Sequence, residues 1–157
     1  MPALPFIQTL SERINRAVEG LLLVIGVAFS LILFVQVVAR YLGSSLSWSE
    51  EIGRYLLVAT TFLGATVAYK RAHFVGLAGI GAKLGPAAAR ALVRALQLLT
   101  LAAFAVITWF GAIYTVNAWT QTSTAVQMPM SLPIACVPLA GAIFLLHVLA
   151  DLLKPAP

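Results

Sequence analysis

Residues 20–39 read GLLLVIGVAFSLILFVQVVA, an uncharged apolar run of about 20 residues, which is the length that an α-helix needs to cross roughly 30 Å of hydrocarbon. The 157-residue chain shares this character, since 61% of its residues are hydrophobic, only 10% are charged and its mean hydropathy is +0.98. That composition supplies too little polar surface to coat a water-soluble protein. The run is longer than the apolar part of a secretory signal and no small-x-small cleavage site follows it, so we expect a retained membrane anchor.

Three further segments are long enough to cross a bilayer. No Asp, Glu, Lys or Arg occurs between Ala95 and Ala150, which leaves room for two crossings, and the polar stretch before Pro129 and Pro133 marks the break between them. The sequence therefore predicts an all-α integral membrane protein with four transmembrane helices in a single membrane domain, residues 1–157. The expected helices cover about residues 17–40, 49–69, 88–119 and 132–153.

The basic residues indicate how the chain is oriented. With four crossings, the N-terminal tail, the segment between the second and third helices and the C-terminal tail share one side of the membrane. Of the ten lysines and arginines, only Arg40 and Arg54 fall on the other side. The positive-inside rule thus predicts that both ends lie in the cytoplasm. The net charge of +5 does not indicate nucleic acid binding, because long apolar tracts separate the basic residues.

The segment between the second and third helices favours a short helix lying in the cytoplasmic interface. Phe74, Leu77, Ile80 and Leu84 recur at helical spacing, although the glycines among them weaken this interpretation. The basic residues around this segment form a collar suited to anionic lipid headgroups. Its members are Lys70, Arg71, Lys83, Arg90 and Arg94.

The most distinctive local pattern is SWSEEIGRY, from Ser47 to Tyr55. Ser47 followed by Glu50 fits a capping box, and the spacing of Glu50 and Arg54 allows an ion pair along one helix face. The simplest interpretation is a well-capped helix with an aromatic anchor at headgroup depth. The functional alternative is a docking surface for another membrane subunit, because ionisable groups near membrane depth need a partner. The residues of this pattern that we single out are Trp48, Glu50, Glu51, Arg54 and Tyr55.

Two other features are weaker. Gly64 and Ala68 form a small-xxx-small pair of the kind that lets helices approach closely. His73 and His147 are the only histidines, and a bis-histidine haem is a minor alternative to ordinary interfacial histidines. Cys136 is the only cysteine, so neither a disulfide within the chain nor a cysteine-built metal site is expected. The sequence contains no pattern typical of a nucleophile with its base, a metal cluster or a phosphate loop, so we expect neither an enzyme nor a cofactor.

Two stretches resemble a known family. The pattern Trp48-Ser49-Glu50-Glu51-x-x-Arg54-Tyr55, continued by residues 62–65 and 70–73, is similar to the small membrane subunit (DctQ-type) of tripartite ATP-independent periplasmic (TRAP) transporters. So is the segment from Met128 through Pro138 to His147. The apolar residues 74–76 depart from the family, which often has a basic and then an acidic residue there. On this resemblance Pro129 and Pro138 join Gly64, Ala68 and the SWSEEIGRY residues as candidates for anchoring or for contact with a partner.

The resemblance implies a non-catalytic scaffold subunit in a bacterial inner membrane. Its partners would be a large multi-helix permease subunit, which holds the substrate and sodium sites, and a periplasmic binding protein that delivers an organic acid. One alternative is a self-sufficient four-helix multidrug exporter, a class with a carboxylate inside its first helix, which residues 20–39 lack. The bis-histidine haem protein remains the other alternative.

Overall fold

The computed structural model describes residues 3–72 and 85–153, and within these ranges the chain is helical apart from its connections. It contains four helices that are long and apolar enough to cross a membrane, which confirms the predicted fold class for the described residues. The elements are α1 (Ala3–Tyr41), α2 (Ser47–Ala72), α4 (Pro86–Asn117), the 3₁₀ turn η1 (Ala118–Thr120), α5 (Ser131–Ile134) and α6 (Cys136–Leu152). The interfacial helix predicted near Phe74 to Leu84, with His73 and Lys83, lies outside the described residues.

The first helix begins at Ala3, well before residue 17, where its apolar run starts to look like a membrane span. The extra turns carry polar residues that hydrophobicity does not place in a membrane. These turns are nonetheless part of the helix, and they pack against the rest of the bundle, since Ser11 is fully buried and Asn15 is 6% exposed. The end of α1 is fixed by Gly43, whose φ of +80° suits glycine. Gly43 N donates to the Arg40 carbonyl and Ser44 N to the Ala39 carbonyl, so the helix closes in a Schellman motif.

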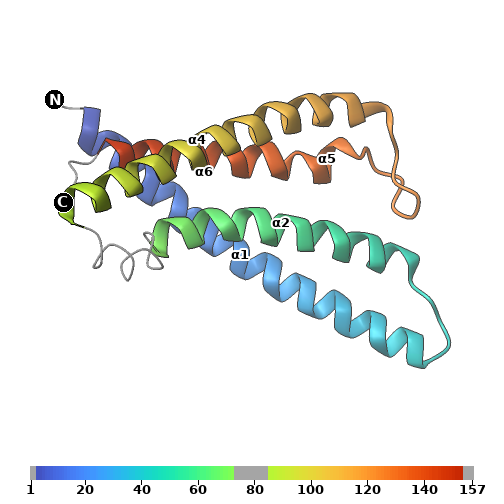
Figure 1. The fold of residues 1–157 in the computed structure, drawn as a ribbon. Helices are drawn as coiled ribbons and strands as arrows, with labels where there is room; N and C mark the ends of the chain where they lie inside the picture. Colours follow the sequence, from blue (N-terminus) through green and yellow to red (C-terminus); the bar gives the residue numbers. More distant parts are fainter. Residues whose placement is uncertain (1–2, 73–84, 154–157) are drawn as a thin grey trace.

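The helices form two antiparallel hairpins, α1–α2 and α4–α6 (Figure 1). Within the hairpins α1 packs on α2 and α4 packs on α6, and α6 also contacts α2 and α1. The hairpins meet at the end that holds the first turns of α1 and the last turns of α6, and they diverge toward the end that holds the two connections (Figure 1). Both ends of the described chain therefore lie at the same end of the bundle.

The core lies where the hairpins meet. Val18, Leu63 and Ala140, one from each of three helices, are buried against one another. Between α4 and α6, the rings of Phe104 and Phe144 stack with their centroids 3.6 Å apart. Gly141 lies so close to Thr108 that an added Cβ would overlap the Thr108 hydroxyl and come within 3.3 Å of its Cβ. The α4–α6 contact thus depends on a glycine, as small-residue packing in membrane helices does.

Candidate functional site

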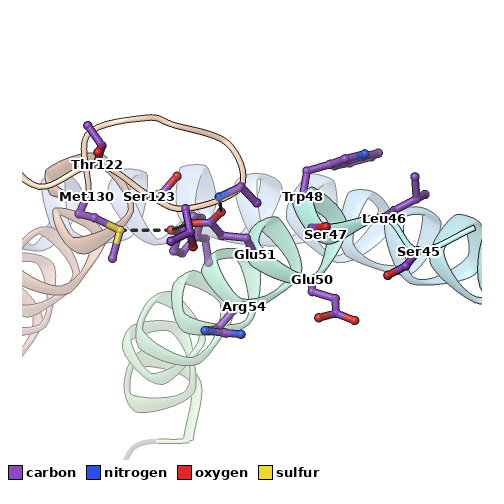
Figure 2. A pocket seen from close by; sticks show the side chains of 13 residues that line it. Ser45, Leu46, Ser47, Trp48, Glu50, Glu51, Arg54, Thr122, Ser123 and Met130 are labelled. Carbon is purple, nitrogen blue, oxygen red and sulfur yellow. Dashed lines mark hydrogen bonds between the residues drawn. The ribbon is translucent and has the colours of Figure 1, made fainter.

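A cavity of about 760 Å³ lies at the end of the bundle away from the termini of the described chain. Its walls come from the α1–α2 connection, the first turns of α2 and the connection before α5 (Figure 2). Trp48, Glu50, Glu51, Arg54 and Tyr55, the residues that the sequence singled out, all line it. The structure therefore brings the SWSEEIGRY pattern together with a segment about 75 positions later in the chain, where Ala125 and Val126 bind Glu51.

Glu51 fastens this later segment to α2. Its carboxylate accepts hydrogen bonds from Ala125 N at 2.8 Å, from Val126 N at 3.1 Å and from the Tyr55 hydroxyl. The same hydroxyl lies 3.3 Å from the sulfur of Met130. An ionised carboxylate makes stronger hydrogen bonds than a neutral acceptor, so this arrangement, which we name the Glu51 clasp, holds the connection in place. Glu51 and Tyr55, which the sequence proposed for contact with a partner, thus bind other residues of the same chain.

The connection that Glu51 holds is itself folded. Ser123 N donates to the Met128 carbonyl at 2.9 Å, and Met130 N donates to the Gln121 carbonyl at 2.8 Å, which closes a small hairpin over residues 121–130. Gln127 turns it with a φ of 55°, in the left-handed region that few non-glycine residues adopt. The sequence predicted a break in the helix here, but nothing in it predicted that the break would fold back on α2.

Glu50 points the other way. It accepts hydrogen bonds from Arg40 Nη2 at 3.4 Å and Gln36 Nε2 at 3.3 Å, both from α1. The Glu50–Arg54 ion pair that the spacing allowed is not formed, because the end of α1 brings Arg40 to Glu50 instead. Arg54 is exposed, and it makes no ion pair with any carboxylate in residues 3–72 and 85–153.

The serine hydroxyl that bonds at the start of α2 is that of Ser49, and not that of Ser47, for which the sequence predicted a capping box. The hydroxyl of Ser49, which is fully buried, donates to the Leu46 carbonyl at 2.7 Å. Trp48 is 42% exposed, so it is free to act as the interfacial anchor that the sequence predicts.

The opposite end of the bundle holds a polar cluster that sequence reasoning missed. Ser11 Oγ lies 2.8 Å from Nδ1 of His147, and both side chains are fully buried. Asp151, one turn after His147, is 9% exposed. Hydrophobic spacing gives no signal for this cluster, because Ser11 precedes the apolar run and its partner is 136 positions away. His147 is therefore a core residue, where the sequence favoured an interfacial one.

Two members of the basic collar, Arg71 and Arg94, contribute to the fold. Arg71 binds Glu19 of α1 with two hydrogen bonds, Nε to Oε1 at 2.7 Å and Nη2 to Oε2 at 2.6 Å. Arg94 donates to the Leu152 carbonyl at the end of α6 at 2.7 Å. Arg90 is exposed. Contact of the collar with lipid headgroups stays a prediction.

The remaining candidates divide between inward and outward positions. Pro138 packs against Gly111, where an added Cβ would lie 3.4 Å from its Cδ. A Cβ added at Gly64 would meet nothing within 4 Å, and Ala68 is exposed, so this small pair is not used inside the chain. Pro129 forms an isolated bridge with Thr122 and belongs to the hairpin that Glu51 holds.

Comparison with known proteins gives one decisive match. The family described as tripartite ATP-independent periplasmic transporters, DctQ component, matches residues 29–157. This chain belongs to the DctQ family. The DctQ match contains the Glu51 clasp, the Gly141–Thr108 contact and His147, whereas Ser11 and Glu19 precede it. The chain is thus a small permease subunit of a TRAP transporter and a multi-pass membrane protein.

A relative from Haemophilus influenzae supports the DctQ assignment. It is provisionally named a TRAP transporter small permease protein and is 38% identical to this chain over 80 residues. The aligned region spans 50% of this chain and 50% of the relative's own length. The similarity therefore reaches across half of each protein.

Proposed function

We propose that this DctQ protein is a non-catalytic scaffold for the large subunit of a sodium-driven TRAP transporter that imports an organic acid. The observation that carries the proposal is where the charges lie. The stretches Gly20–Ala39, Tyr55–Tyr69 and Ala95–Ala150 contain no Asp, Glu, Lys or Arg. An organic anion crossing the membrane needs cationic or strongly polar groups along its path, so a chain with an uncharged middle supports a bracing role.

The charges at the helix ends support the same role. Glu19 is bound to Arg71, Glu50 to Arg40 and Glu51 to the hairpin of residues 121–130. These groups fix helices and connections relative to one another, which is what a rigid support requires. We further propose a bacterial inner membrane location with both termini in the cytoplasm. The partners would be the large permease subunit, a periplasmic binding protein that delivers the substrate through the complex, and membrane lipids.

Co-expression with a large TRAP permease subunit tests the proposal. A tag on this chain should retain the large subunit during purification in detergent. Proteoliposomes that contain both subunits and are supplied with the binding protein should take up an organic acid when a sodium gradient is applied. Proteoliposomes that contain this chain alone should take up none.

Two results would overturn the proposal. Sodium-dependent or proton-dependent transport by the chain alone would favour the self-sufficient exporter. A haem absorption band in the purified chain would favour the bis-histidine alternative, in which His147 would have to leave its contact with Ser11 or bind through Nε2.

A further inference from the structure

The exposed residues of α2 fall on one face. After the first turn they recur at intervals of three and four positions, which places them along a single side of the helix. The other side of α2 packs inside the bundle, where Leu63 is 7% exposed and Thr66 fully buried. We name the exposed side the outer face of α2. It consists of Glu50, Arg54, Leu57, Thr61, Ala65, Ala68 and Arg71, of which Arg71 binds Glu19 of α1.

The outer face of α2 differs in chemistry from the exposed faces of its neighbours. On α1 and α4 the exposed side chains include bulky apolar groups such as Phe34 and Trp109, each 68% exposed, which suit lipid tails. On α2 the exposed large hydrophobic side chains described are Trp48 and Leu57. An 18-residue window of α2 has a mean hydropathy of 1.2, against 2.9, 1.9 and 2.2 for the corresponding windows of the other three spans. Of the four spans, α2 is the least suited to face hydrocarbon.

Arg54 brings a cation to this face and forms no ion pair in residues 3–72 and 85–153. It lies seven residues after Ser47, so it is about 10 Å along the helix from the start of α2. Its two nearest carboxylates in sequence are already engaged, Glu50 by Arg40 and Glu51 by the hairpin amides. Figure 2 shows Arg54 pointing away from the hairpin that Glu51 binds. A guanidinium near the membrane boundary is costly without an ion-pair partner, and no carboxylate of the described residues pairs with it.

We propose that the outer face of α2 docks against a membrane helix of the large subunit that presents a carboxylate opposite Arg54. Ala65 and Ala68 lie about three and about four turns beyond Arg54 on the same face and permit the close backbone approach that such helix pairs use. This inference rests on the proposed scaffold function and adds which helix makes the contact.

A second copy of this chain does not fit the same face. Two copies inserted in the same direction and related by a two-fold axis along the membrane normal would bring the same residues together at the same depth. Arg54 would then meet Arg54 of the second copy. Like charges brought together in a low-dielectric environment repel, so charge complementarity selects a different chain with an acidic group.

Photo-crosslinking in the assembled complex tests the docking face without depending on a destabilising mutation. A benzophenone amino acid placed at Thr61 or Ala65 should form a covalent adduct with the large subunit. The matched control positions are Ala105 and Trp109, exposed on α4, where no such adduct is expected. Adducts from the α4 positions alone, adducts with a second copy of this chain, or adducts with lipid alone at Thr61 and Ala65 would overturn the inference.

Charge and bulk variants add a second measurement. Arg54→Glu and Ala65→Trp should each lower the amount of large subunit that co-purifies by about tenfold, because the first breaks a desolvated ion pair and the second separates the helices. Arg54→Lys should retain most of the binding, and Ala105→Trp should match the wild type. If Arg54 only reaches lipid phosphate, Arg54→Glu will co-purify normally and the inference fails.

The failure of the inference is distinguishable from failure of the proposed function. Loss of co-purification by the wild type contradicts the scaffold role itself. Normal co-purification of both the wild type and the α2 variants contradicts only the docking face. Each variant is also purified alone in detergent, so that reduced binding is compared at equal amounts of folded small subunit.

Discussion

The hydroxyl of Ser11 on α1 and the ring of His147 on α6 form a hydrogen bond between residues 136 positions apart, with Oγ 2.8 Å from Nδ1. Both side chains are fully buried. The bond links the two hairpins at the end where they meet, so the polar first turns of α1 are held against the last helix (Figure 1).

His147→Ala should destabilise the isolated subunit by about 1 to 2 kcal/mol, because it leaves the buried Ser11 hydroxyl without its partner. Thermal unfolding in detergent measures the change. The matched control is Leu149→Ala on the same helix, since Leu149 is 45% exposed. Ser11→Ala combined with His147→Ala should cost less than the sum of the two single changes, and strictly additive effects would contradict the bond.

Glu51→Gln should loosen the hairpin over residues 121–130 and leave the helices intact. The neutral amide is a weaker acceptor and offers one oxygen where the carboxylate offers two, so the bonds from Ala125 N, Val126 N and the Tyr55 hydroxyl cannot all be kept. We expect the Ala125 and Val126 amides to exchange with deuterium about tenfold faster, as the loss of roughly 1.4 kcal/mol predicts.

The adjacent carboxylate provides the control for that experiment. Glu50→Gln removes a charge of the same kind from the next residue, but Glu50 faces Arg40 on α1. Its variant should leave exchange in the hairpin unchanged. Equal effects from the two variants would mean that the hairpin responds to net charge and not to the Glu51 bonds.

The contrast between these two neighbouring carboxylates shows what the sequence predicts and what it leaves out. Hydrophobic run lengths, proline positions and the charge distribution are local properties, so they predicted four spans and the break before Pro129. They also identified the SWSEEIGRY residues, which line the cavity. Which carboxylate binds inside the chain depends on how the hairpin of residues 121–130 folds back, and that is a tertiary contact with no local pattern. The burial of His147 beside Ser11 is hidden for the same reason.

Gly141→Ala should destabilise the subunit by about 1 to 3 kcal/mol, as overpacking of a tight contact does. The new methyl group would overlap the Thr108 hydroxyl, which already donates to the Phe104 carbonyl at 2.7 Å and cannot rotate away without losing that bond. Thr108→Ala should recover part of the loss in the double variant.

Gly64→Ala serves as the control, because a Cβ there meets nothing within 4 Å. That variant should be slightly stabilised by helix propensity in the isolated chain, by up to about 1 kcal/mol. A Gly141 variant as stable as the Gly64 variant would rule out the close contact.

Cysteine labelling tests the proposed orientation of the bundle. Cys136 is the only cysteine, so its replacement by Ala gives a background without thiols. Ser44→Cys and Thr124→Cys place an exposed thiol in each of the two connections, and Leu153→Cys places one after α6, at the opposite end. A membrane-impermeant maleimide applied to cells with a permeabilised outer membrane should label the first two. It should label the third only after lysis, because the positive-inside rule predicts that the end with the excess of basic residues lies in the cytoplasm. Labelling of Leu153→Cys before lysis would mean that the orientation is the reverse of the one proposed. Labelling of only one connection would contradict the four-crossing arrangement.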